Sequence, residues 1–181
     1  MIIYKDILSG DEIVSDTFDL KTVEGGVLWE CDVRKYNKNM NETIVLEGAN
    51  PSAEGEDEDG GQGEGETKLV YDIEDQFRLV WLKEEEGMKP SKDAFKAHLK
   101  SYVKKVNNKL KEKGASEETI KEFQAGAPGA VKKILANYDN YDVLMGSSYD
   151  GDAMHVLIDY REDGVTPYAT IWKHGLEEMK V

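Results

Sequence analysis

The chain has 181 residues, of which 39 % are hydrophobic and 33 % are charged, and its formal net charge is −14. This length suits one domain with a single core, and the acidic balance excludes nucleic acid and anionic membranes as default partners, leaving cations and the basic faces of proteins. With Cys31 as its one cysteine, the chain forms no internal disulfide and has no Cys-x-x-Cys zinc pair.

The first part of the chain is predicted to be rich in β-strands. Short runs of branched and aromatic residues cover 2–8, 27–33 and 43–46, and turn-forming residues separate them at 9–11, 24–26 and 37–41. Residues 68–71 and 77–83 are again typical of strands. Charged side chains begin at Lys5, too early for a signal peptide, and no apolar run approaches bilayer length. We therefore expect a cytoplasmic protein without a membrane span.

An acidic segment separates these two groups of strands. Residues 54–66 contain seven carboxylates, five glycines and one glutamine, with no apolar side chain. Such a segment buries no apolar surface that would offset the entropy lost on ordering. The sequence therefore predicts a mobile acidic loop over residues 47–67.

The carboxylates of this loop form the candidate metal site, because clustered oxygen ligands attract Ca²⁺. With Gly60 at the glycine position of an EF-hand loop, three carboxylates fall on ligand positions, but Gly55 stands first, where an aspartate is needed. A true EF-hand therefore does not fit. Two interpretations stay open, a weak calcium site and a loop that is merely solvated. The candidate ligands are Glu54, Asp57, Asp59 and Glu66.

Residues 91–139 are predicted to form an antiparallel helical hairpin inserted between strands. Ser91 suits the N-cap of a first helix, apolar residues then recur at helical spacing, and Gly114 suits the helix end. Ser116 suits the N-cap of a second helix, in which Pro128 and its neighbouring glycines predict an interruption with a kink.

The C-terminal part returns to β-structure. Residues 154–160 and 168–173 are predicted strands, and residues 161–167 between them form a turn with Asp-Gly chemistry. Because strands dominate both ends and helices are grouped in one insert, we expect a single α+β domain over residues 1–181.

The first predicted helix carries a basic face that is unusual in so acidic a chain. Its lysines form two rows with a spacing of four residues, although like charges at this spacing destabilise a helix by a few tenths of a kcal/mol per pair, roughly. One interpretation is a docking surface for an acidic partner such as the tails of tubulin, and the other is a solvated helix face. The candidate docking residues are Lys92, Lys96, Lys100, Lys104, Lys105 and Lys109.

The sequence indicates no catalytic site. His98, His155 and His174 have no cysteine or carboxylate at a recognisable ligand or triad spacing, and no phosphate-binding glycine motif follows a strand. Cys31 lies in a predicted strand and is expected to be a buried, unreactive thiol. We therefore predict a non-enzymatic protein that requires no cofactor.

Five segments together resemble the translationally controlled tumour protein family over the whole chain. They are residues 1–6, 10–16, 48–54, 133–138 and 159–168, of which the third and fifth are long and specific. The resemblance implies a β-tent core, shared with a Rab exchange factor and with methionine sulfoxide reductases, plus the helical hairpin and the acidic loop. The reductase chemistry and the zinc of other tent proteins do not carry over, because the cysteines that they need are absent.

The resemblance also implies functions. The family is described as calcium-binding, microtubule-associated, growth-promoting and anti-apoptotic, with tubulin, translation elongation factors and pro-survival apoptosis regulators as implied partners. The tubulin-binding region of the family matches residues 95–124, which agrees with the basic face.

An alternative function implied by the resemblance is nucleotide exchange on a Rheb-type small GTPase, with Glu12 as the contact residue. Two departures bear on these roles. A second family carboxylate, in a Gly-Glu pair, is replaced by Gly146-Ser147, and the C-terminal cysteine of many members is replaced by Val181. A disulfide-linked dimer through the C-terminus is therefore not expected.

Overall fold

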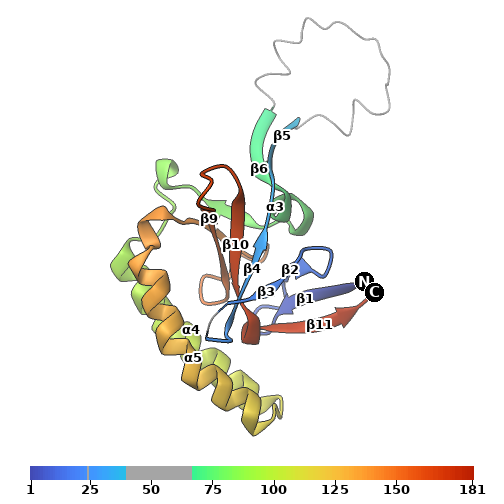
Figure 1. Ribbon diagram of the computed structural model, residues 1–181, viewed down its shortest axis with the longest axis vertical. Helices are drawn as coiled ribbons and strands as arrows, with labels where there is room; N and C mark the ends of the chain where they lie inside the picture. The colour runs from blue at the N-terminus through green and yellow to red at the C-terminus, as the bar shows by residue number, and fades with distance from the viewer. Residues whose placement is uncertain (24, 40–66) are drawn as a thin grey trace, which may run out of the picture. The chain divides into compact units, whose positions relative to one another are not determined.

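The computed structural model describes residues 1–23, 25–39 and 67–181 (Figure 1). The predicted strand at 43–46, residues 47–66 of the predicted acidic loop and all four candidate calcium ligands lie outside the described residues. The described residues divide into a larger unit, residues 1–34 with 73–181, and a smaller unit within residues 35–72. Each unit is considered by itself.

The larger unit contains two sheets in which all paired strands are antiparallel. The six-stranded sheet has the order β3 (Lys21–Thr22), β4 (Leu28–Asp32), β10 (Pro167–Trp172), β9 (His155–Tyr160), β8 (Asp142–Met145) and β7 (Val80–Leu82). The three-stranded sheet has the order β11 (Leu176–Lys180), β1 (Ile2–Asp6) and β2 (Glu12–Ser15). Neighbouring strands are therefore often distant in sequence, as in the pairing of β1 with β11.

The smaller unit is a pair of antiparallel strands, β5 (Lys35–Asn39) and β6 (Thr67–Tyr71). Lys35 lies opposite Tyr71, and its amine is 5.3 Å from the centre of the Tyr71 ring. The predicted turn at 37–41 is thus wrong for residues 37–39, which continue β5. These residues are polar and have a low intrinsic preference for strands, and their extended conformation depends on pairing with β6.

The helical hairpin is confirmed as two long helices, α4 (Lys92–Glu112) and α5 (Glu117–Ala136). Ser91 and Ser116 are their N-caps, and each hydroxyl accepts a hydrogen bond from a backbone N–H three residues later, at 3.1 Å. Gly114 adopts a φ of +74° directly after α4, as expected of a helix end. The predicted interruption of the second helix is wrong, because α5 continues through Pro128, whose neighbour Ala127 is buried.

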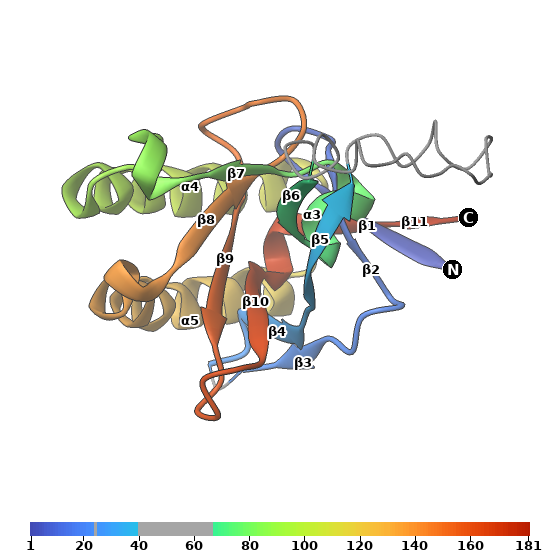
Figure 2. The same cartoon turned by 90° about the horizontal axis from the view of Figure 1, so that it is seen from above.

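The hairpin lies along the six-stranded sheet (Figures 1 and 2). Aromatic side chains form part of this contact. Tyr102 of α4 and Phe123 of α5 both contact Trp172 of β10, with ring centres 5.7 and 6.1 Å apart, and all three side chains are buried. Gly126 lets α5 approach the turn before β4, because a Cβ there would lie 2.5 Å from the carbonyl oxygen of Gly25. Among the described residues, no helix is sufficiently long and apolar to span a membrane.

One predicted strand, at 77–83, is partly wrong. Residues up to Phe77 belong to helix α3 (Asp72–Phe77), and the strand β7 starts only at Val80. Arg78 stops the helix with a φ of +58°, and the N–H of Leu79 then donates to the carbonyl of Glu74 at 3.0 Å. This is a Schellman ending built on an arginine, where a glycine is usual.

Three histidines, of which His155 and His174 are buried and His98 is partly buried, join the hairpin to the rest of the larger unit. His98 Nε2 on α4 lies 3.0 Å from His155 Nδ1 on β9, and His174 Nε2 lies 2.8 Å from a carboxylate oxygen of Glu122 on α5. Burial lowers the pKa of all three histidines from the ordinary value of 6.5. For His155, burial and the neighbouring His98 lower the pKa to about 3.

Because these pKa values are lower in the folded chain, the unfolded chain binds more protons as the pH falls below 6.5. The free energy of unfolding should therefore decrease as the pH decreases, by at most about 1.4 kcal/mol per pH unit for each histidine. Substitution His155→Gln should flatten this dependence between pH 6.5 and 5, as measured by urea unfolding. The control Ile13→Val, at a buried position of β2 in the three-stranded sheet, should lower stability equally at each pH. Parallel curves for His155→Gln and wild type would contradict the assignment.

Candidate functional site

The exposed side of α4 carries a row of four lysines, which we call the lysine face: Lys92, Lys96, Lys100 and Lys104. All four are exposed, whereas the neighbouring stripe of the same helix buries Phe95, Leu99 and Tyr102. Because one helical turn takes about 3.6 residues at 1.5 Å each, the row extends over roughly 18 Å on one side of the helix. Within the described part of the chain, none of the four lysines forms an ion pair.

The second row of lysines has a different environment. Lys105 pairs with Asp152 at 3.4 Å, Lys109 pairs with Glu112 at 4.0 Å, and Lys113 pairs with Glu177. Lys105 and Lys109 are also only partly exposed. The candidate residues Lys105 and Lys109 thus belong to a locally balanced surface, in contrast to the lysine face.

A mixed-charge depression of about 400 Å³ adjoins the second row. Its lining residues are Leu8, Lys105, Asn108, Lys109, Glu112, Asp150 and Asp152. Because three carboxylates and two lysines line it, this depression does not favour an anion. Among the described residues, the unpaired lysines of α4 are therefore those of the lysine face and Lys111.

Glu12, the candidate contact residue for a small GTPase, lies at a separate depression of about 430 Å³. Its lining residues are Gly10, Asp11, Glu12, Gln76, Phe77, Arg78 and Ser147. Glu12 is the exposed first residue of β2, and Ser147 is exposed in the loop between β8 and β9. The fold thus brings together the two positions that the sequence analysis associated with a GTPase.

Asp11 ties the turn before β2 to the loop after β8. Its Oδ2 accepts hydrogen bonds from the backbone N–H and the hydroxyl of Ser148, at 3.2 and 2.7 Å. Gly146 makes room for this contact, because a Cβ there would lie 2.9 Å from both Cβ and Cγ of Asp11. Sequence reasoning missed Arg78 in this depression, since the positive φ that places it has no local signal in an arginine.

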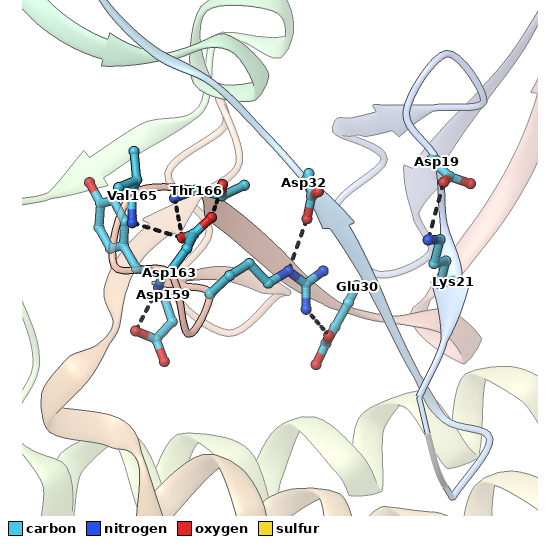
Figure 3. A network of polar contacts seen from close by, with 10 residues as sticks. Asp19, Lys21, Glu30, Asp32, Asp159, Asp163, Val165 and Thr166 are labelled. Atoms are coloured by element: carbon cyan, nitrogen blue, oxygen red, sulfur yellow. Dashed lines mark hydrogen bonds and ion pairs between the residues drawn. The ribbon is translucent and has the colours of Figure 1, made fainter.

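A third polar cluster fixes the turn between β9 and β10 (Figure 3). Arg161 donates to Glu30 at 2.8 Å and to Asp32 at 2.9 Å, and its guanidinium lies 4.0 Å from the centre of the Tyr168 ring. Lys133 of α5 reaches the same Glu30 at 3.7 Å. Because these charges satisfy one another, the cluster is better suited to holding the turn than to binding a ligand.

Hydrogen bonds between residues of the turn itself also stabilise it. Asp163 accepts hydrogen bonds from the N–H of Val165 and from both the N–H and the hydroxyl of Thr166, at 2.7 to 2.9 Å (Figure 3). The bonds from Thr166 and Val165 hold the pKa of the Asp163 carboxyl below its usual value. The specific segment 159–168 is therefore a tightly hydrogen-bonded turn.

The remaining reactive side chains are already engaged or buried. His98 and His155 contact each other, His174 contacts Glu122, and Cys31 is buried in β4. In the part of the chain that the structure describes, no three histidine, cysteine or acidic side chains gather at a metal-sized site. The lysine face and the Glu12 depression are therefore the candidate sites.

Comparison with known proteins identifies the family. Residues 1–177 match the family model described as translationally controlled tumour protein. The chain belongs to the translationally controlled tumour protein family. Among family members, it is 75 % identical to the translationally-controlled tumor protein homolog of Aspergillus fumigatus and 72 % identical to that of Emericella nidulans, with full coverage of both chains in each case.

Solved structures of family members share the fold. The translationally controlled tumor-associated protein of Schizosaccharomyces pombe has a TM-score of 0.75 at 39 % identity, with full coverage of both chains. The Caenorhabditis elegans member has a TM-score of 0.68 at 30 % identity, over 100 % of this chain and 99 % of that chain. The predicted α+β fold of the translationally controlled tumour protein family is confirmed.

Proposed function

We propose that this family member is a non-enzymatic cytoplasmic interaction protein whose lysine face binds acidic segments of other proteins. The observation that carries the proposal is the contrast between the two lysine rows of α4. Lys105, Lys109 and Lys113 each have a carboxylate partner, whereas the lysine face has no ion pair among the described residues. Like charges four residues apart destabilise the helix slightly, and an acidic partner removes that repulsion.

The shape of the lysine face favours an extended acidic chain. Its roughly 18 Å row is long and narrow, so successive carboxylates of a flexible segment can reach successive lysines. The glutamate-rich tails of tubulin have this chemistry, and we therefore propose microtubules as the partner. Binding of this kind is fast, specific for charge and weakened by salt.

The other family roles enter as further proposals. Weak calcium binding would involve Glu54, Asp57, Asp59 and Glu66, which lie outside the described residues, so it rests on the sequence alone. Elongation factors and pro-survival apoptosis regulators remain proposed partners from the resemblance, as do roles in growth and survival.

The double variant Lys100→Glu/Lys104→Glu should bind microtubules about tenfold more weakly, because it replaces two attractive contacts by repulsive ones. Co-sedimentation with taxol-stabilised microtubules at several salt concentrations measures this effect. The remaining binding should also depend less on salt.

The matched control is Lys121→Glu/Lys132→Glu on α5, which makes the same change in net charge at two exposed positions. This control should keep most of the binding, since it leaves the lysine face intact. Equal loss in both variants would show that net charge alone governs binding. Unchanged binding of the first variant would remove the lysine face from the mechanism.

A second candidate function is nucleotide exchange on a Rheb-type small GTPase. It is favoured by one observation: Glu12 is exposed in a depression that also contains Arg78 and Ser147, so charged groups of both signs are available to a partner. Wild type should accelerate release of a fluorescent GDP analogue from the GTPase, and Glu12→Val should not. Equal rates with wild type, Glu12→Val and no added protein would exclude this function.

A further inference from the structure

Ser147 is a solvent-accessible hydroxyl without a structural task. It is exposed in the loop between β8 and β9, and within the described part of the chain its side chain makes no hydrogen bond. The neighbouring Ser148 is the opposite case, since its hydroxyl donates to Asp11 at 2.7 Å. Of two adjacent serines, one holds the loop and the other is available for chemistry.

Other hydroxyls in described turns and caps are engaged. Ser9 accepts from the N–H of Asp11, Ser15 and Thr17 bond each other, and Thr166 donates to Asp163. Ser91 and Ser116 cap the two long helices. Ser101 is exposed but lies within α4, where its backbone is helical. Ser147 is therefore distinguished by exposure, an unused hydroxyl and a loop backbone together.

The residues after Ser147 give the loop an acidic character. Asp150 and Asp152 follow at the third and fifth positions, and Tyr149, directly before Asp150, is 69 % exposed. An enzyme that binds this segment needs a basic substrate groove, by charge complementarity. The lysine face on α4 takes no part in this recognition.

We propose that Ser147 is a phosphorylation site for an acid-directed serine/threonine protein kinase. In this reaction the Ser147 oxygen attacks the γ-phosphorus of ATP. The bond from that phosphorus to the β,γ-bridging oxygen breaks, ADP leaves, and the hydroxyl proton passes to the catalytic base of the kinase. The inference is independent of acidic-partner binding by the lysine face.

The phosphate then enters the depression that holds Glu12. Arg78 lines the same depression, is exposed and has no ion pair in the described ranges, so it is positioned to pair with the new anion. Asp11 and Glu12 line the depression as well and oppose this pairing, since the hydrogen bonds from the neutral Ser148 do not cancel the charge of Asp11. Phosphorylation thus couples Ser147 to Arg78 and adds about two negative charges beside Glu12.

The first test is phosphorylation of the full chain by casein kinase II with magnesium ATP, followed by mass-spectrometric mapping. A Ser52→Ala background removes the serine that precedes the acidic residues 54–66. Phosphate should be found at Ser147, and Ser147→Ala should abolish most of the incorporation into the peptide that contains it. Modification of Ser148 in its place, or no modification of this peptide, would overturn the proposal.

The second test uses ³¹P NMR of the phosphorylated protein, whose phosphate would otherwise have a second pKa of about 6. Pairing with Arg78 should lower this value, and Arg78→Gln should raise it by about half a pH unit. The control Lys96→Gln removes a cation on the lysine face and should leave the value unchanged. A value above that of free phosphoserine, or equal values with and without Arg78, would overturn the pairing.

Discussion

The contact of Trp172 with one aromatic ring from each long helix determines how the helical hairpin sits on the sheet. Tyr102 of α4 and Phe123 of α5 bind the same indole of β10, so neither helix can rotate about its axis without losing this contact. Gly126 lets α5 come near the turn before β4, and His98 meets His155 of β9. With one side of α4 fixed against the sheet, its lysine face must lie outward.

Among the described residues, the charges are distributed so that no carboxylate pairs with this outward face. Asp152 and Glu177 come from the loop after β8 and from β11, and they neutralise lysines that face the rest of the fold. The same loop also reaches the Glu12 depression, where Ser148 bonds Asp11. One loop therefore adjoins both candidate surfaces, by an ion pair to α4 and by hydrogen bonds to the turn before β2. A partner that displaced this loop would alter both.

How much could be predicted from the sequence depended on whether the signal was local. The two long helices followed from their N-cap serines and apolar periodicity, and the turn at 161–167 followed from its Asp-Gly pair. In contrast, β8 and β11 are short strands that pair with strands far away in the sequence: β8 pairs with β7 on the other side of the helical hairpin, and β11 pairs with β1. Arg78 ends a helix in a conformation that is typical of glycine. The spacing of the lysines in the sequence predicted the basic face, but the ion pair between Lys105 and Asp152 could not be predicted without the fold.

The central claim is that the fold leaves one row of lysines on α4 for an acidic partner. Its most direct measurement is an NMR titration of the ¹⁵N-labelled full chain with a glutamate-rich peptide that has the sequence of a tubulin tail. Saturable shifts should concentrate on the amides and amines of Lys92, Lys96, Lys100 and Lys104 and disappear at high salt. Shifts concentrated on α5 or the sheet, or no saturable shift at low salt, would contradict the account.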